Sequence, residues 1–251
     1  MMRKVLKIGC CGFAGGLNNY LSKFSLVEVQ QTFYTPPKEA TLYNWKKKAP
    51  TGFEFALKAW QAITHPPTSP TWRKCPEEKR PKQFNQVGNF RPTKAVFKAW
   101  ESVLSWSKIL DSKVIVFQTP PSFKPTKQNI SNMKDFFSTV NRDDLILCWE
   151  PRGEWLVDIS KLKTVVERLN IVQVVDPFWD KPVTSTYFVY FRLHGLGHRY
   201  NYSYDYNESD LRRLKTMVDA YLDEGKIVYV LFNNISMLKS SIAFKALFKN
   251  N

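Results

Sequence analysis

Eight short apolar runs, most of them rich in β-branched residues, recur along the chain, and nearly every run ends on a polar side chain. The polar ends are, in order, Cys10 and Cys11, Thr32 to Tyr34, Lys58, Gln118, Glu150, Asp176, His194, and Asn233 with Asn234. Most runs precede a helix-like stretch, and this alternation is typical of parallel strands joined by helices. The pattern predicts an α/β fold, a (β/α)8 barrel of the TIM type, with its active-site mouth at the C-terminal strand ends.

The chain has 251 residues, which matches the roughly 250 typical of one such barrel, so we expect a single domain over residues 1–251. The predicted strands cover residues 5–9, 26–33, 53–60, 113–119, 145–150, 171–175, 187–193 and 227–233. The clearest predicted helices cover residues 18–24, 38–48, 93–110, 209–224 and 236–248.

A long polar segment, residues 61–92, is rich in proline and interrupts this rhythm after the third strand. Loops of that length in a compact domain are usually functional or disordered, and this one follows a strand end, so we expect a lid over the barrel mouth. Its aromatic residues, Trp72, Phe84 and Phe90, alternate with cations. They either stack bases while the cations contact phosphates, or anchor the segment to the barrel.

The formal net charge is +15 and the isoelectric point is near 9.6, which favours binding to a polyanion, with nucleic acid the first candidate. The alternative is a solvated, lysine-rich surface without a specific partner. We expect a soluble cytoplasmic protein, because the N-terminal stretch lacks the apolar core of a signal peptide and no apolar run approaches the length of a membrane-spanning helix. The four cysteines fit neither a disulfide framework nor a zinc-binding spacing, and we interpret them as structural.

Alternation along the second strand places Glu28 and Gln30 toward the barrel interior. A buried carboxylate is unfavourable unless it is paired. Glu28 therefore either forms a structural ion pair with Arg192 or Lys58, or belongs to the functional site.

The strand ends supply groups for acid–base chemistry, and the catalytic candidates are His194, Glu150, Asp176 and His65. The candidates for substrate binding are Tyr34, Lys58, Gln118, Arg152, Arg192, Tyr204 and Asn233. The turn from Gly195 to Gly197 follows the seventh strand, where barrels commonly bind phosphate through backbone N–H groups; a tight strand exit is the alternative. A divalent metal, Mg, Mn or Zn, is a further hypothesis, with Glu28, Glu150, Asp176 and His194 as ligands.

Five stretches together resemble one family. They are Val27-Glu28-Val29-Gln30-Gln31-Thr32-Phe33-Tyr34, Lys58 with Ile63-Thr64-His65, Gln118-Thr119-Pro120-Pro121-Ser122-Phe123, Tyr190-Phe191-Arg192-Leu193-His194-Gly195, and Phe232-Asn233-Asn234. In this order they resemble the YecE-like family of unknown function (domain of unknown function 72) over nearly the whole chain. The resemblance implies a TIM-type barrel and no settled activity.

The chain departs from the family pattern at three places. The first loop reads Gly9-Cys10-Cys11-Gly12-Phe13 where the family resembles G-x-S-G-W, and Gln30 stands where the family usually has Asn. After the fifth strand the family tends toward E-F-R-H-x-S-W. Glu150, Arg152 and Trp155 are kept, but Gly153 replaces the histidine, so no role of that histidine carries over.

Three functions remain open on these observations. The first is a hydrolase acting on a phosphate-bearing substrate, with nucleic acid as the leading candidate, in which His194 and Glu150 act as acid or base. Lys58, Arg152 and Arg192 would bind phosphate. The second is a non-catalytic module that binds nucleic acid or a protein, and the third is an enzyme acting on a small phosphorylated metabolite or sugar.

Overall fold

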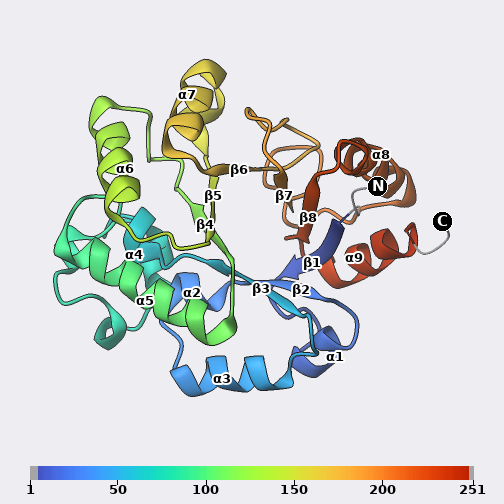
Figure 1. Ribbon diagram of the computed structural model, residues 1–251, viewed down its shortest axis with the longest axis horizontal. Coiled ribbons are helices and arrows are strands. Elements are labelled where there is room, and N and C mark those ends of the chain that lie inside the picture. Colours follow the sequence, from blue (N-terminus) through green and yellow to red (C-terminus); the bar gives the residue numbers. More distant parts are fainter. Residues whose placement is uncertain (1–4, 249–251) are drawn as a thin grey trace. The chain divides into compact units, whose positions relative to one another are not determined.

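The computed structural model describes residues 5–248, and its eight parallel strands form a closed barrel in chain order, as predicted (Figure 1). The chain divides into two compact units, which are described one at a time. The first unit contains the described residues up to Glu28, the segment Lys48–Glu54, and the described residues from Val174 onward. The second unit contains Val29–Lys47 and Phe55–Gln173.

The strands are β1 Val5–Cys11, β2 Leu26–Val29, β3 Glu54–Lys58, β4 Val114–Gln118, β5 Ile146–Glu150, β6 Val172–Val175, β7 Phe188–Leu193 and β8 Ile227–Phe232. The α-helices are α1 Leu17–Leu21, α2 Gln31–Tyr34, α3 Glu39–Lys48, α4 Gln61–Thr64, α5 Lys94–Leu110, α6 Lys127–Thr139, α7 Ile159–Leu169, α8 Glu208–Asp223 and α9 Met237–Ala246. Short 3₁₀ helices are η1 Pro70–Lys74, η2 Glu77–Lys79, η3 Phe84–Gln86 and η4 Gly153–Leu156.

The second strand is shorter than the sequence predicts. It ends at Val29, and residues 31–34 form the single turn of α2 instead of continuing the strand. Thr32 explains the change, because its buried hydroxyl donates to the carbonyl oxygens of Val29 and Lys58 at 3.0 and 2.7 Å. A threonine that hydrogen-bonds nearby backbone offers the chain an alternative to a strand ladder.

In the first unit, β8 lies between β1 and β7. The register runs from Val5 opposite Ile227 on one side, and from Phe188 opposite Ile227 on the other. The helix α8 begins at a capping box, in which the side chain of Asn207 accepts from Asp210 and the Asp210 carboxylate accepts from the Asn207 N–H. Gly225, at a φ of 75°, follows the helix in the left-handed conformation in which many helices end.

Glu28 and Arg192 form an ion pair in this unit, with no solvent exposure of either side chain. Arg192 Nη2 lies 3.1 Å from Glu28 Oε1, and the Tyr190 hydroxyl donates to Glu28 Oε2 at 2.8 Å. Burial and the charge of Glu28 raise the pKa of Tyr190 well above its usual value. Of the two partners predicted for Glu28, the structure pairs it with Arg192.

In the second unit, α5 buries one apolar face, which includes Val96, Trp100, Val103 and Leu110. Its first turn is capped by Thr93, whose hydroxyl accepts from the Val96 N–H at 3.3 Å. An aromatic cluster surrounds the fully buried ring of Phe90, with ring centroids 5.3–5.7 Å away. Its other members are Phe117, Phe123, Phe136 and Phe137.

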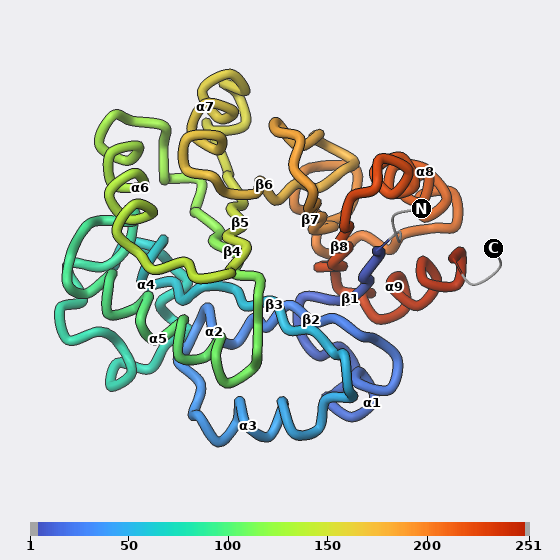
Figure 2. Tube along the Cα trace, in the orientation of Figure 1, coloured from blue at the N-terminus to red at the C-terminus, as the bar shows by residue number. Residues whose placement is uncertain are grey.

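Residues 61–92 contain α4 and three 3₁₀ helices. Figure 2 shows the part of this segment after α4 as a long excursion between α4 and α5. The ends of this excursion are tied together, because the N–H groups of Gly88, Asn89 and Phe90 donate to carbonyls within α4. Trp72 and Phe90 are both buried, and Phe90 packs against Phe117 of β4, which agrees with the anchoring alternative for that ring. The function of the segment as a lid stays a prediction.

All four cysteines are buried and free, in agreement with a structural role. Burial raises the pKa of the Cys10 thiol to about 11 and so disfavours a reactive thiolate. Between Val5 and Phe248, no helix combines the length and the apolar character needed to cross a bilayer. The cytoplasmic location stays a prediction.

The substitution Arg192→Met should lower the free energy of unfolding by about 3–5 kcal/mol, because it leaves the Glu28 carboxylate buried without its cation. The double substitution Glu28→Leu, Arg192→Met removes both charges, and it should be less destabilising than Arg192→Met alone. Urea denaturation at neutral pH measures both.

Arg212→Gln is the matched control, since Arg212 pairs with Glu208 on the solvated face of α8. Loss of an exposed pair should change the free energy of unfolding by less than about 1 kcal/mol. Equal destabilisation by Arg192→Met and Arg212→Gln would contradict the importance of the buried pair.

Candidate functional site

Four polar side chains gather at the carboxyl ends of β3, β4 and β5 in the second unit; we call them the strand-end group. Lys58 Nζ donates to Gln118 Oε1 at 2.9 Å. Arg152 donates to Glu150 Oε1 through Nε at 2.8 Å and Nη2 at 2.7 Å. The two pairs are neighbours because Gln118 and Glu150 are register partners in the sheet. The strand-end group thus joins four of the residues that the sequence nominated.

Lys58 is almost completely buried, with 4% of its surface exposed. Its ammonium lies 4.0 Å from the ring centroid of Phe33 and 5.9 Å from that of Tyr34. Aromatic faces attract a cation, so α2 supplies part of the environment that holds this charge. Tyr34, predicted to bind substrate, is thereby placed beside the strand-end group.

His65 is buried, and its Nδ1 lies 2.8 Å from the Thr64 hydroxyl. Burial and the nearby charges of Lys58 and Arg152 lower the pKa of His65 to about 3. A neutral imidazole at pH 7 keeps one N–H, which is a very weak acid, and at this pKa its other nitrogen is a weak base. The lowered pKa of His65 therefore reflects first its burial and then the two neighbouring cations, and it does not favour a proton-transfer role.

Asp176 and His194 are brought together in the first unit, where each follows a strand directly. Asp176 Oδ2 accepts from the backbone N–H of His194 at 2.8 Å, and it lies 3.6 Å from His194 Nδ1. Asp176 Oδ1 accepts from the Phe178 N–H at 3.2 Å. The Asp176 carboxylate therefore holds the backbone of His194 in place and so positions its imidazole.

Tyrosines at alternate positions, 200 to 206, line the loop after β7. The rings of Tyr200 and Tyr202 contact the His194 ring edge to face, with centroids 5.3 and 5.6 Å away. Of these tyrosines, only Tyr204 was nominated from the sequence. The period-two spacing in Asn201-Tyr202-Ser203-Tyr204-Asp205-Tyr206 was the signal that could have found the others.

The Tyr204 hydroxyl donates to Asp210 at 2.8 Å, and its carbonyl accepts from Asn234 Nδ2 at 2.7 Å. Asn233 donates its backbone N–H to the Leu193 carbonyl at 2.9 Å. Asn234 is the more buried of the two asparagines, and its Oδ1 has no hydrogen-bond partner in the part of the chain that the structure describes. These contacts tie the loop after β8 to the loop after β7.

The turn after β7 is tight. Gly195 has a φ of 96°, and a Cβ at this position would lie 2.1 Å from the Asn201 carbonyl oxygen. Its N–H donates to the Tyr206 hydroxyl at 2.7 Å. The turn fits a tight strand exit, and the N–H of Gly195 is used within the protein.

No group of three or more His, Cys, Asp and Glu side chains within residues 5–248 is arranged to hold a metal ion. Two of the four nominated ligands have cationic partners, Glu28 with Arg192 and Glu150 with Arg152. A metal at either carboxylate would have to compete with a guanidinium. The divalent-metal hypothesis stays a prediction.

Solved structures share this fold at low sequence identity. A DUF72 family protein from Enterococcus faecalis V583 matches with a TM-score of 0.74 and 20% identity, over 100% of both chains. A DUF72 family protein from Thermotoga maritima MSB8 matches with a TM-score of 0.70 and 20% identity, over 98% of this chain and 100% of the other. A xylose isomerase domain containing protein from Salmonella typhimurium LT2 has a TM-score of 0.56 and 11% identity, over 98% of this chain and 96% of the other.

A comparison with curated proteins finds no match. The family model described as protein of unknown function DUF72 matches residues 12–250, and the resemblance predicted from the five motifs is confirmed. The chain belongs to the DUF72 family of proteins of unknown function.

Proposed function

We propose that this protein is a hydrolase acting on a phosphate-bearing substrate, with nucleic acid as the leading candidate. The observation that carries the proposal is the strand-end group, in which two cations, Lys58 and Arg152, are held at the carboxyl ends of β3 and β5, on either side of β4. In (β/α)8 barrels this end carries the active site. The net charge of +15 further favours a polyanionic substrate.

The cations are suited to phosphate for two reasons. Lys58 is buried, and a charge in a water-poor environment interacts more strongly with an anion than it does in bulk water. Arg152 is held by two hydrogen bonds to Glu150, so its planar guanidinium is oriented before any ligand arrives. The orientation of Arg152 reduces the cost of ordering the site on binding.

Proton transfer is assigned to His194 and Glu150. Asp176 positions His194 through the backbone N–H, and Tyr200 and Tyr202 restrict the imidazole ring. The proposed roles are general acid for His194 and base toward water for Glu150. Arg192 is left out of the phosphate-binding set, because it is fully buried and paired with Glu28.

Substitution of His194 by Ala should abolish cleavage of the preferred substrate, with a loss on the order of 10²- to 10⁴-fold expected for removal of an acid–base group. The measurement uses end-labelled single-stranded DNA, duplex DNA and RNA on denaturing gels, with Mg or Mn and with a chelator. His198→Gln is the control, since His198 is an exposed histidine four residues away. A protein that cleaves none of these substrates under any condition is not a nuclease. Cleavage that persists with the chelator removes the metal hypothesis.

Substitution of Arg152 by Met should weaken substrate binding, because it removes a phosphate-binding cation, and should also raise the pKa of His65, because a positive charge near the imidazole is lost. Substrate titration and NMR titration of the histidine signals measure the two effects. Lys124→Met is the control, because Lys124 is half exposed and pairs with Glu154 at the surface. An Arg152→Met variant that binds substrate normally would exclude Arg152 from phosphate binding.

The protein should lose stability as the pH falls below about 6.5, in part because of His65. The pKa of His65 is about 3 in the folded protein and has an ordinary value of 6.5, so only the unfolded chain takes up the proton in this range. The stability that the neutral imidazole contributes is complete above pH 6.5 and is lost toward pH 3. Between pH 6.5 and pH 5 the loss should be about 1.5 kcal/mol.

Urea denaturation of the wild type and of His65→Gln at both pH values tests this assignment. The substituted protein should lose about 1.5 kcal/mol less between the two pH values than the wild type does. The comparison of pH dependences removes any uniform destabilisation by the substitution. Identical pH dependences would show that His65 is protonated equally in the folded and unfolded states.

A further inference from the structure

A groove of about 450 Å³ lies in the second unit between the segment around Arg80 and the first two turns of α5. Its charged lining consists of four cations, Arg80, Lys82, Lys94 and Lys98, and includes no acidic side chain. None of the strand-end group lines it. The groove is therefore a cationic feature that the proposed function does not use.

Three of the four cations are solvent-exposed lysines, Lys82, Lys94 and Lys98, and none of them has an ion-pair partner among the described residues. Arg80 is held in place. Its Nε and Nη2 donate to the carbonyls of Cys75 and Trp72, and its Nη1 contacts the exposed carboxylate of Glu77. The groove thus combines one oriented guanidinium with three ammonium groups that are available to a ligand.

Trp60 also lines the groove, and only 7% of its surface is exposed. Its indole N–H has no hydrogen-bond partner within the described part of the chain. Buried donors are nearly always satisfied, and an unpaired one carries a desolvation cost. A ligand oxygen in the groove would supply the missing acceptor.

Lys94 and Lys98 are four residues apart on α5, which places them about 6 Å apart along one helix face. Arg80 and Lys82 line the groove from the other segment. A single phosphate monoester carries a charge of about −1.5 to −2, which neutralises only part of four cations. A chain of phosphates, one per nucleotide, matches the number and distribution of these charges better.

We propose that this groove binds the phosphate backbone of single-stranded nucleic acid, with Arg80, Lys82, Lys94 and Lys98 contacting phosphates and the Trp60 N–H donating to a phosphate oxygen. Positively charged grooves that follow the backbone are the usual basis of such binding. The binding does not require the strand-end group to be catalytic. It adds a second contact surface to the protein, between α5 and the segment around Arg80.

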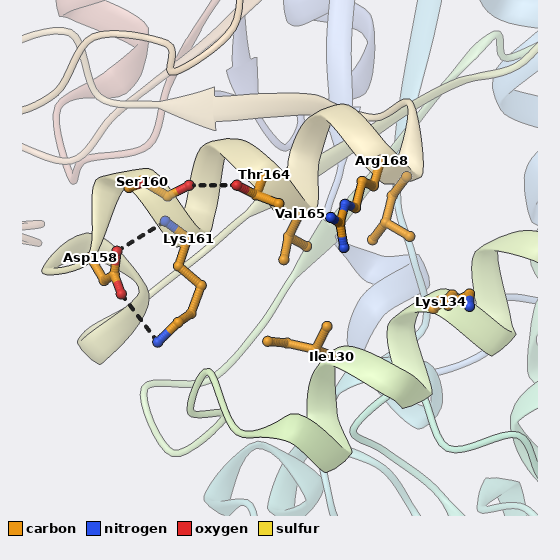
Figure 3. Close-up of a pocket in the computed structure, with 9 residues that line it drawn as sticks. Ile130, Lys134, Asp158, Ser160, Lys161, Thr164, Val165 and Arg168 are labelled. Carbon is orange, nitrogen blue, oxygen red and sulfur yellow. Dashed lines mark hydrogen bonds and ion pairs between the residues drawn. The ribbon is translucent and has the colours of Figure 1, made fainter.

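A second groove of about 690 Å³, between α6 and α7, provides the matched control (Figure 3). It also has exposed cations, Lys134 and Arg168, but Asp158 lies among them and pairs with Lys161. Ile130 and Val165 point into this groove (Figure 3). The two grooves share the overall excess of positive charge and differ in whether the lining includes an acid and an unpaired donor.

The test is fluorescence anisotropy with labelled oligothymidylate at several salt concentrations, in the presence of a chelator so that cleavage does not interfere. The double variant Lys94→Gln, Lys98→Gln should bind on the order of tenfold more weakly than wild type at moderate salt. The slope of log affinity against log salt concentration should fall by about 1.4, that is, about 0.7 for each lost phosphate contact. Trp60→Phe should weaken binding about fivefold without changing the slope, because it removes a neutral donor.

The control variant Lys134→Gln, Arg168→Gln removes the same charge and should change affinity less than twofold. Equal effects of the two double variants would overturn the proposal, since binding would then depend on net charge alone. Failure of the wild type to bind oligothymidylate at physiological salt would also overturn it, as would displacement of the oligonucleotide by inorganic phosphate at equal phosphate concentration. Binding without cleavage of any substrate would contradict the proposed hydrolase and leave the groove assignment standing.

Discussion

The buried ion pair between Glu28 and Arg192 determines which face of β7 points inward in the first unit. A carboxylate and a guanidinium without solvent exposure must meet each other, because either one alone would be strongly unfavourable in the interior. Tyr190 joins them two residues earlier on β7, so the face of the strand that carries positions 190 and 192 is fixed inward. Alternation then directs position 194 to the same face, where His194 meets Asp176 at the end of the strand. The position of the proposed acid follows from an ion pair that takes no part in the chemistry.

In the second unit, the register between strands determines where the polar side chains lie. The pairing of Gln118 with Glu150 places the ends of β4 and β5 at one level. Gln118, which is neutral, then holds Lys58, and the acidic Glu150 holds Arg152. Burial of the imidazole, together with the charges of Lys58 and Arg152, lowers the pKa of His65 to about 3. A histidine that stays neutral does not compete with Lys58 or Arg152 for an anion, and it adds no further repulsion between the cations. The buried imidazole is compatible with a phosphate site for that reason.

Most of the strand ends could be predicted from the sequence, because a parallel strand buried on both faces has an apolar run that stops at a polar residue. The contacts that the side chains make at these strand ends could not be predicted from the sequence. The pairing of Glu28 was left between Arg192 and Lys58, since alternation gives the face of a side chain and not its neighbour across the barrel. The helical turn at residues 31–34 depends on one hydroxyl that reaches the Lys58 carbonyl, a contact 26 residues away in sequence. The buried state of Phe90 depends on packing against Phe137 of α6, which lies outside its own segment and which local composition does not record.

The net charge alone was a poor guide to where a polyanion would bind, because lysines occur throughout the helices and many of them are paired. Lys113 contacts Asp144, Lys215 contacts Asp219, and Lys239 contacts Asp205, so these cations are partly neutralised where they stand. The property that distinguishes the proposed binding groove is therefore local. Its cations share a concave surface, no acidic side chain lies among them, and a hydrogen-bond donor that the protein leaves unsatisfied lies next to them. Positions 80 to 98 meet this condition only because the chain returns on itself after α4 and brings residues 88–90 back to α4. The closure of that excursion, which the composition of the segment would not predict, places Arg80 and Lys82 on the same groove as α5.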